Sequence, residues 1–431
     1  MNLEDLILVS VDDHVVEPAD LFVGRMPKRF ADDAPRVIHN DDGTDVWVYQ
    51  GVTVPYLGLN AVAGRPPEEY HLEPSSYDEF RPGCYDVHER IKDMSANGVL
   101  GSLNFPSFPR FCGQLFTEAA TEDRELALAV IQAYNDWHIE GWCGAYPDRF
   151  IPMAIMPLWD PELMATEIHR VADLGCHAVA FSMNPYRLGL PSLHSDHWDP
   201  FWRACEAREI VVCMHIGSGS FEVVTSPDAP FDVRITCSGI NIYPTAADLV
   251  WSPIFRKFDG LKVALSEGGI GWIPYFLERA DYTYKHHRGW TGQDLGDKLP
   301  SDVFKEHVIP CFIDDQFGAQ HLEWMNPDMV TWECDYPHSD TTWPQSPETL
   351  ADSIRGLSDD LVANITHRNA MRLFHFDPFA IRASERCTVG ALRAEVAGHD
   401  ISVVSRGVRE RRTTSVGAVL DAVEAMSGRH S

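Results

Sequence analysis

The sequence predicts an α/β fold, a (β/α)8 barrel, from three observations. Eight short runs rich in β-branched and apolar residues recur, and a segment of helical period follows each. The chain has 431 residues, 45% of them hydrophobic, which is enough for one large core. Strands that alternate with helices pair in parallel, and eight such units close a barrel. The predicted strands span residues 6–11, 99–105, 150–156, 177–182, 210–215, 261–267, 308–313 and 329–335.

The helices between these strands are recognisable from their ends. Asp160 and Asp199 each precede a proline, which places a side-chain acceptor before a proline at the first helical position. Gly98 is typical of a helix stop. Residues 358–374 predict a helix that closes the barrel. The other predicted helices span residues 86–97, 122–145, 161–174, 200–208, 246–258, 273–287, 316–325 and 347–357.

The alternation of strands and helices also predicts the domain organisation. Residues 1–376 form the barrel, and residues 377–431 form a C-terminal extension in which basic residues outnumber acidic ones. Three insertions, residues 20–85, 217–245 and 288–305, interrupt the alternation. We expect them at the rim of the barrel where the strands end, building a lid or a substrate pocket.

The charge balance limits the kinds of partner. With 64 acidic and 35 basic residues the formal net charge is −29, which repels nucleic acid and anionic membrane surfaces. The N-terminus carries no basic, apolar leader, and no apolar stretch is long enough to span a bilayer. The ten cysteines form no C-x-x-C pair, so we expect reduced, buried thiols. We therefore expect a cytoplasmic protein.

Metal-binding residue types end four of the predicted strands. Asp12 and His14 follow the first strand, and the residue between them points to the opposite side because side chains alternate. His215, Glu267 and Asp335 end the fifth, sixth and eighth strands. Since strand ends converge at one mouth of a barrel, these five side chains predict a metal site there.

Three further residues are candidates, each with a simpler alternative. Glu17 precedes a proline and either binds the metal or caps a turn. His286 lies near the end of a predicted helix, where it is either a ligand or a solvated histidine favoured by the helix dipole. His338 lies in an Asp-Tyr-Pro-His segment and either contacts the metal ligands or lies outside the site.

The ligand types indicate which metals fit. Carboxylates and imidazoles without a thiolate suit iron or manganese at least as well as zinc. The strand at 177–182 contains no lysine, so no carboxylated lysine bridges two metals from there. Asp12, Glu17, Glu267 and Asp335 supply four negative charges, which favours two divalent ions. The sequence contains no motif for bound nucleotide or flavin, so electrons for any redox reaction come from a separate donor.

The chain resembles the amidohydrolase-2 branch of the amidohydrolase superfamily in three features: the D-x-H motif, the histidine after the fifth strand and the Asp-Tyr-Pro after the eighth. Members of this branch are metal-dependent hydrolases and nonoxidative decarboxylases. By that resemblance Asp12, His14, His215 and Asp335 match metal ligands. Glu267 stands where the branch commonly has a catalytic histidine. The segments VDDHVVEP, HIGSGS, SEGGIGWIP, YKHHRGW and ECDYPHSD are similar to a subgroup of TIM-barrel nonheme diiron monooxygenases.

This second resemblance implies a hydroxylase that uses two iron ions, O2 and an external electron donor. The implied substrate is bulky and apolar, like a diterpenoid, and carried as a coenzyme A thioester. Asp12, His14 and Asp335 would bind one iron, Glu267 and His286 the other, with His215 and Glu17 completing the set. His338 would tune a ligand by hydrogen bonding. The alternative is a hydrolase or nonoxidative decarboxylase with zinc or manganese. Long excursions and a separate tail also suggest a homodimer.

Overall fold

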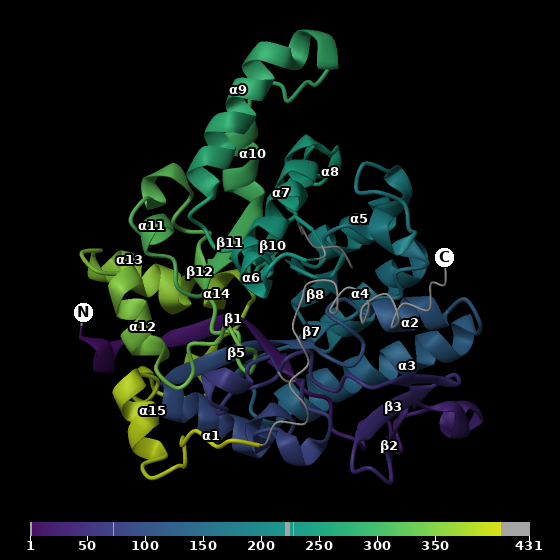
Figure 1. Cartoon of the computed structure of the whole chain (residues 1–431). Coiled ribbons are helices and arrows are strands. Elements are labelled where there is room, and N and C mark those ends of the chain that lie inside the picture. The colour runs from purple at the N-terminus through teal and green to yellow at the C-terminus, as the bar shows by residue number, and fades with distance from the viewer. Residues whose placement is uncertain (1, 72, 220–224, 227, 407–431) are drawn as a thin grey trace.

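Eight parallel strand positions form the centre of the protein, so the predicted (β/α)8 barrel is confirmed (Figure 1). The computed structural model describes residues 2–71, 73–219, 225–226 and 228–406. Strands β1, β5 and β6 form one parallel sheet, and β7 to β12 form another. Their bounds are β1 (Leu8–Val15), β5 (Val99–Pro106), β6 (Phe150–Ile151), β7 (Met153–Ala154), β8 (Ala178–Phe181), β9 (Val211–His215), β10 (Val263–Ser266), β11 (Val308–Phe312) and β12 (Thr331–Trp332).

Two local features explain how these sheets make one ring. Pro152 separates β6 from β7, because proline has no N–H to donate to a neighbouring strand, so these two strands fill one position of the barrel. At the other join, the backbone N–H of Asp335 donates to the carbonyl of Asp12 at 2.9 Å. This hydrogen bond links the segment after β12 to β1, and it brings two predicted metal ligands together.

Helices cover the outside of the barrel (Figure 1). Their bounds are α1 (Val87–Asn97), α2 (Gln114–Ala119), α3 (Arg124–Asp136), α4 (Pro161–Asp173), α5 (Asp199–Ala207), α6 (Phe231–Ser238), α7 (Ile242–Trp251), α8 (Ile254–Lys257), α9 (Ile273–Thr291), α10 (Pro300–His307), α11 (Gln316–Ala319), α12 (Ser346–Ser353), α13 (Asp359–Ala363), α14 (Asn369–Leu373) and α15 (Val389–Glu395). No helix of the described ranges combines the length and the apolar character that crossing a membrane requires.

The capping predictions have mixed outcomes. Asp160 caps α4, since its carboxylate accepts the backbone N–H groups of the second and third helical residues. Gly98 ends α1 in the left-handed conformation, with φ at 80°. Asp199 is not a cap, because the chain is already helical at Trp198. The Asp199 carboxylate instead accepts from Lys257 Nζ at 2.9 Å.

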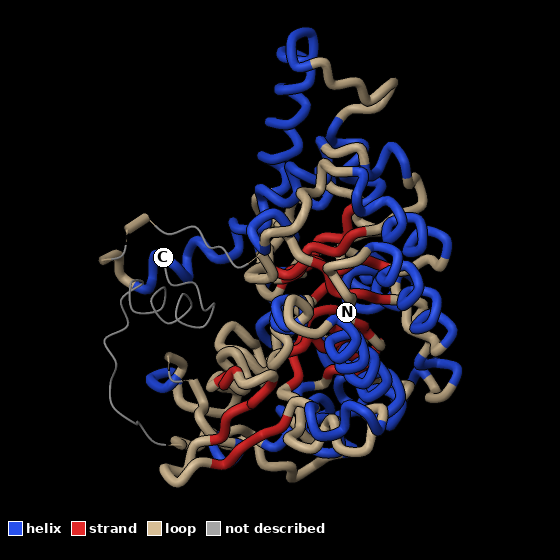
Figure 2. The backbone as a smooth tube through the Cα atoms, turned by 90° about the vertical axis from the view of Figure 1, so that its right-hand side faces the viewer, coloured by secondary structure: helices blue, strands red, loops and turns tan. Residues whose placement is uncertain are grey.

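The segment between β1 and α1 forms a small antiparallel sheet of β2 (Arg36–His39), β3 (Asp45–Tyr49) and β4 (Val52–Val54). Trp47 of β3 is fully buried and stacks on Phe108, in the segment after β5, with ring centroids 4.2 Å apart. This sheet therefore packs against the end of the barrel where the strands terminate. At the opposite extreme of the molecule, α9 extends far beyond the barrel (Figure 2).

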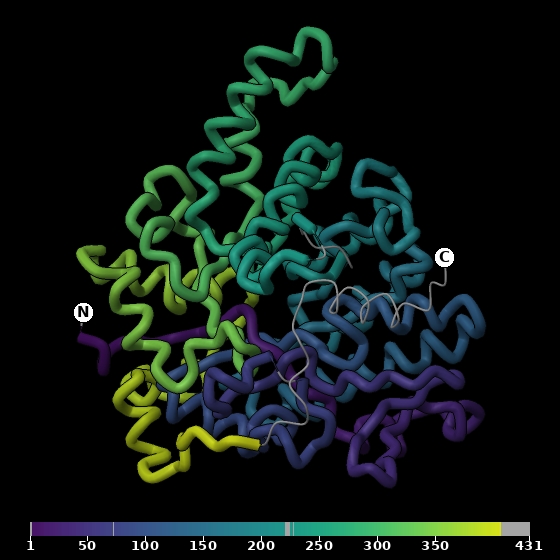
Figure 3. The backbone as a smooth tube through the Cα atoms, viewed as in Figure 1, coloured from purple at the N-terminus to yellow at the C-terminus, as the bar shows by residue number. Residues whose placement is uncertain are grey.

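The described part of the C-terminal extension packs on the barrel. The backbone N–H of Val389 donates to the carbonyl of Leu6 at 2.8 Å, which places α15 beside the N-terminal residues (Figure 3). Arg393 of α15 forms an ion pair with Glu348 of α12 at 2.7 Å. Residues 407–431 of this extension, and parts of the predicted 217–245 insertion, lie outside the described residues. The domain boundaries stay predictions.

Candidate metal centre

The first strand supplies two of the metal-ligand candidates. β1 runs to Val15 and has a register shift between Ser10 and Asp13. Asp12 and His14 both reach the centre of the barrel, as alternation predicts. The intervening Asp13 points elsewhere, and its carboxylate accepts from the backbone N–H of Tyr336 at 2.9 Å. The local strand geometry thus places an aspartate and a histidine of one strand on a common target.

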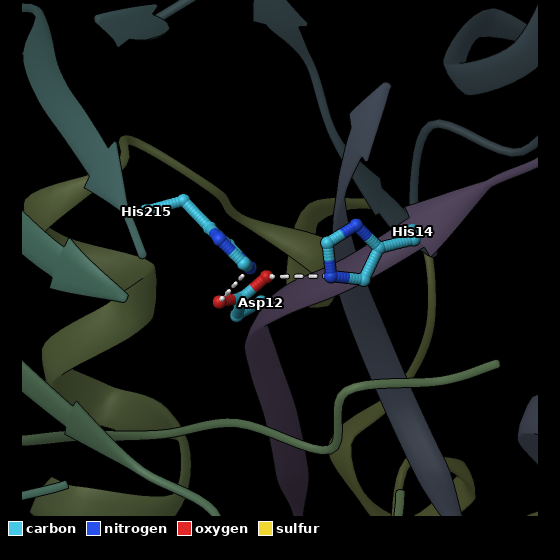
Figure 4. A group of neighbouring side chains, drawn as sticks. All are labelled: Asp12, His14 and His215. Carbon is cyan, nitrogen blue, oxygen red and sulfur yellow. Dashed lines mark ion pairs between the residues drawn. The ribbon is translucent and has the colours of Figure 1, made fainter. Parts of the chain in front are cut away.

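Asp12 lies between two imidazoles (Figure 4). Its Oδ1 atom is 3.5 Å from His14 Nε2, and its Oδ2 atom is 3.4 Å from Nε2 of His215 at the end of β9. All three side chains are at most 1% exposed. One ligand atom from each lies within 4.8 Å of the others, a spacing that suits a single cation.

A second trio shares His14. His14 Nε2 is 3.1 Å from Asp335 Oδ1, and Asp335 Oδ1 is 3.2 Å from His338 Nδ1. The His14 and His338 rings stack with centroids 3.6 Å apart. These atoms also lie within 4.8 Å of one another. Because both trios contain His14, they form one site at the strand ends, as the sequence predicts.

Two glutamates extend the site. Glu267 follows β10, and its Oε2 atom is 3.2 Å from His215 Nε2. Glu333 was not predicted; it follows β12, is fully buried, and its Oε2 atom accepts from the backbone N–H of Glu267 at 3.3 Å. Its signal in the sequence is the two-residue spacing from Asp335, the same spacing that joins Asp12 to His14.

The backbone around these carboxylates is strained. Glu267 and Asp335 have φ values of 60° and 58°, in the left-handed region that residues with side chains rarely adopt. Such positions cost roughly 1–3 kcal/mol each and cluster at functional sites. Both residues lie where a strand ends, and this backbone conformation points their carboxylates toward the same centre.

Burial sets the protonation of the site. It raises the pKa of Asp12 far above its usual value, and the nearby carboxylates Glu333, Asp335 and Glu267 raise it further. Burial likewise raises the pKa of Asp335, and that of Glu333 to about 8. Burial lowers the pKa of His215 to about 3. The imidazole is therefore neutral at pH 7, which is the form that binds metals.

These potential ligand atoms pair with one another but lack hydrogen-bond partners within the described residues. Both carboxylate oxygens of Asp12 and of Asp335, and the Nε2 atoms of His14, His215 and His338, are buried without a hydrogen bond. Unsatisfied buried polar atoms are costly, and a divalent cation would satisfy them and compensate the carboxylate charge. The residues present therefore fit a divalent metal ion.

Contacts outside the donor atoms hold the ligands in place. The carbonyl oxygen of Ile216 hydrogen-bonds with His215 Nδ1, which leaves Nε2 facing the site. The buried guanidinium of Arg90 donates to the carbonyl of His14 and, at 2.6 Å, to that of Gly83. The backbone N–H of His14 donates to the carbonyl of Tyr336 at 2.7 Å. These bonds fix the backbone that carries His14.

Two phenylalanines form an apolar wall beside the imidazoles. The ring of Phe111 lies 4.3 Å from that of His215 and 5.3 Å from that of His14. Phe105 lies 4.9 Å from His215. Phe105 is fully buried, whereas Phe111 is only partly buried. The aromatic residues of the predicted 273–287 helix do not form this wall, which comes from β5 and the loop after it.

Two predicted ligands do not join the site. The Glu17 carboxylate accepts the backbone N–H groups of Ser107 at 3.1 Å and Phe108 at 2.7 Å, together with the Tyr134 hydroxyl at 3.2 Å. It lies beyond the end of β1 and is held by these donors. His286 is exposed on α9, where its ring stacks on Tyr282 at 3.8 Å. Neither belongs to the two trios that share His14.

The barrel holds a buried ring of carboxylates and imidazoles at its strand ends, an arrangement that fits a bound metal ion. A family model described as Amidohydrolase matches residues 64–376, and the chain belongs to this family. Gamma-resorcylate decarboxylase of Rhizobium sp. (strain MTP-10005) is 29% identical over 251 residues, which are 54% of this chain and 67% of that protein. The enzyme of the same name from Rhodococcus jostii (strain RHA1) is 27% identical over 285 residues, 60% of this chain and 74% of that protein.

Solved structures show the same fold. An amidohydrolase from Mycobacterium avium subsp. paratuberculosis K-10 has a TM-score of 0.64 at 19% identity, covering 85% of this chain and 99% of that one. The 5-carboxyvanillate decarboxylase of Novosphingobium aromaticivorans DSM 12444, complexed with manganese and 4-hydroxy-3-methoxy-5-nitrobenzoic acid, has a TM-score of 0.57 at 18% identity, covering 87% and 98%.

These relatives correct the functional prediction. The expected diiron monooxygenase is wrong, because both curated relatives named above are decarboxylases, not oxidoreductases. The expected hydroxylation of a diterpenoid-like coenzyme A thioester, with its O2 and external electron donor, is withdrawn with it. The expected iron pair has no support, whereas the alternative metals, zinc and manganese, are consistent with the manganese in a solved relative.

Proposed function

We propose that this protein is a metal-dependent nonoxidative decarboxylase of small aromatic acids. The observation that carries the proposal is the ring of buried, unsatisfied donor atoms on Asp12, His14, His215 and Asp335. These four residues would hold one divalent ion, manganese or zinc. When bound, such an ion stabilises negative charge on an acidic substrate. The likeness to decarboxylases of hydroxylated benzoates supports the choice of reaction.

His338 is the residue we assign to proton transfer. Decarboxylation breaks the bond between the ring carbon and the carboxylate, CO2 leaves, and the ring carbon needs a proton. The Nδ1 atom of His338 lies 3.2 Å from Asp335, while its Nε2 atom is buried without a hydrogen bond. A hydrogen bond from Nδ1 to the Asp335 carboxylate would orient the ring, leaving Nε2 to hold and deliver the proton.

The apolar wall suits the same substrates. The partly buried ring of Phe111 lies against both His14 and His215. An aromatic acid with its carboxylate near the metal ligands would place its ring against this phenyl group. Phe105 and Phe111 would also exclude water from the reacting carbon. The wall therefore favours a planar aromatic substrate over a sugar or a peptide.

A hydrolase is the second candidate, and one observation favours it. The side chain of Glu267 is 16% exposed, more than the other ligand-like side chains, and it lies 3.2 Å from His215. A carboxylate at the edge of a metal site can accept a proton from an attacking water. This reading predicts hydrolysis of an amide or ester without release of CO2.

The test is CO2 release from 2,6-dihydroxybenzoate and 5-carboxyvanillate by protein loaded with manganese. We expect release at equal rates in air and under argon, and loss of release after chelation. An Asp335→Asn variant, which removes a metal-ligand charge, should be inactive, whereas Asp196→Asn, at an exposed carboxylate, should retain activity. Turnover that requires O2, or an absence of CO2 from aromatic acids, would contradict the proposal. Cytoplasmic location stays a prediction.

A further inference from the structure

The insertion between β1 and α1 reaches the segment that carries His338. The backbone N–H groups of residues 62 and 63 both donate to the carbonyl of Pro337, each at 2.9 Å. The side-chain amide of Asn60 donates to the hydroxyl of Ser339 at 2.7 Å. These hydrogen bonds hold the chain on both sides of His338. The insertion therefore lies against the residue to which we assign proton transfer.

Glu73 of the same insertion is fixed at this contact by one of its carboxylate oxygens. Its Oε2 atom accepts the backbone N–H of Asn60 at 2.6 Å. Leu59 and Asn60 have φ values of 46° and 77°, both in the left-handed region that residues with side chains rarely adopt. Strain of this kind persists where the surrounding structure fixes the backbone, and it is common at ligand sites. The loop thus holds the Glu73 carboxylate beside the segment that carries His338.

The other carboxylate oxygen of Glu73 has no partner. Among the residues that the structure describes, Glu73 Oε1 is buried without a hydrogen bond, and so is His338 Nε2. A buried oxygen without a donor is costly, because it has lost its hydrogen bonds to water. A donor supplied by a bound molecule would remove this cost. The function proposed above gives Nε2 of His338 a role but leaves Oε1 of Glu73 without one.

Charge also connects the two residues. Burial raises the pKa of Glu73 to about 7. The hydrogen bond from Asn60, the imidazole of His338 and the guanidinium of Arg65 lower this pKa, in decreasing order. Coulomb interactions weaken with distance, so the influence of the imidazole agrees with the contact described above. Glu73 and His338 therefore present an acceptor and a proton carrier in one neighbourhood.

We propose that Glu73 is a specificity-determining residue that accepts a hydrogen bond from a ring hydroxyl of the substrate. This inference rests on the proposed function, because it takes the substrate to be an aromatic acid whose reacting carbon lies at His338. A hydroxyl group supplies the donor that Oε1 lacks, whereas a second carboxylate or a phosphate would be repelled. The substrate class then narrows from aromatic acids to hydroxylated aromatic acids. It also gives the insertion, which the sequence predicts to build a substrate pocket, a defined part in recognition.

Binding of two unreactive probes tests this proposal. In 2-nitroresorcinol and 2-nitrophenol a nitro group replaces the carboxylate, so neither releases CO2, and the two differ by one hydroxyl. At pH 8, where Glu73 is ionised, we expect manganese-loaded wild-type protein to bind 2-nitroresorcinol roughly 10- to 100-fold more tightly in calorimetry, because a hydrogen bond to a charged acceptor is strong. Glu73→Gln should lose most of this preference, because a neutral amide forms a weaker hydrogen bond. The matched control is Glu68→Gln, at an exposed glutamate of the same insertion, which should keep the preference.

Three outcomes would overturn the proposal. They are a wild-type protein that binds neither probe, a wild-type protein that binds both equally, and a Glu73→Gln variant that keeps the full preference or weakens both probes by the same factor. Equal thermal midpoints of the variants would establish that they are folded.

Release of CO2 from 2,6-dihydroxybenzoate separates this inference from the proposed function. Release by a protein that binds the two probes equally would overturn the role of Glu73 alone. A preference for 2-nitroresorcinol that Glu73→Gln abolishes, without any CO2 release, would overturn the decarboxylase and leave recognition of a ring hydroxyl by Glu73 standing.

Discussion

Replacing Asp12 by asparagine should abolish the stabilisation that a bound metal gives without lowering the stability of the metal-free protein. In the metal-free protein, burial and the carboxylates of Glu333, Asp335 and Glu267 disfavour the ionised form of Asp12, and this is why its pKa is raised. The Asp12→Asn variant removes that charge with almost no change in shape, so the metal-free variant should be at least as stable as the metal-free wild type. The same change removes a ligand that lies between His14 and His215, so stabilisation by metal should be lost.

The size of the effect follows from linkage. A metal at a thousand times its dissociation constant stabilises the folded state by about 4 kcal/mol. Unfolding entropy is about 2.1 cal/mol/K per residue, so the 431 residues give about 0.9 kcal/mol/K. Dividing the two predicts that manganese raises the thermal midpoint of the wild type by about 4–5 °C.

Differential scanning fluorimetry with manganese and with chelator measures both quantities. The wild type should show the rise and Asp12→Asn should show almost none. The control is Asp196→Asn, at a side chain 79% exposed that pairs with Lys257, and its rise should match that of the wild type. An equal rise in Asp12→Asn, or a metal-free variant much less stable than the metal-free wild type, would refute the reasoning.

Three further predictions concern His338, Glu333 and Glu17. His338→Gln should keep its bound metal but lose roughly 10²–10⁴-fold in kcat, measured as CO2 release; an unchanged kcat would remove His338 from proton transfer. Without metal, burial raises the pKa of Glu333 to about 8 in the folded state, against 4.5 in the unfolded chain. The unfolded chain therefore loses this proton first, so the free energy of unfolding should fall as pH rises from 4.5 to 8. Glu333→Gln should flatten that decline, which urea titrations measure. Glu17→Gln weakens the hydrogen bonds from Ser107 and Phe108, which tie the loop bearing Phe111 to the end of β1. We expect KM to rise while the metal content, measured by plasma emission, stays the same. Loss of metal would instead make Glu17 a ligand.

The barrel was predictable because its signals are local and repeated. Each strand is a short apolar run, and the alternation with helices leaves few topologies open. The convergence of Asp12, His14, His215 and Asp335 then follows from topology, since all of them lie at the carboxyl ends of parallel strands. The strand lengths were less predictable: β1 continues through the metal ligands to Val15, because backbone pairing with β5 does not end where the apolar run does.

The residues that the sequence misplaced depend on longer-range geometry. His286 was expected at the site through the likeness to diiron monooxygenases, but α9 leads away from the barrel and leaves His286 in solvent. Glu17 follows β1 closely, but the backbone N–H groups of Ser107 and Phe108 donate hydrogen bonds to its carboxylate and hold it away from the site. Neither the helix direction nor the loop position is encoded in spacing along the chain.

The chemistry was the least predictable level. Carboxylates and imidazoles serve as ligands both for oxygen-activating iron and for metals that act only as Lewis acids. The same donor list therefore fits an oxygenase and a decarboxylase, and the short motifs resemble both. Glu267 in place of a histidine counted against decarboxylation, which the sequence left as the alternative, but His338, against Asp335, offers another group for proton transfer.

The central claim is that one divalent ion lies among these strand ends, and anomalous diffraction from crystals grown with manganese tests it most directly. We predict a single anomalous peak at coordination distance from Asp12, His14, His215 and Asp335. An absence of any peak there, or two peaks of equal height sharing these carboxylates, would contradict the account.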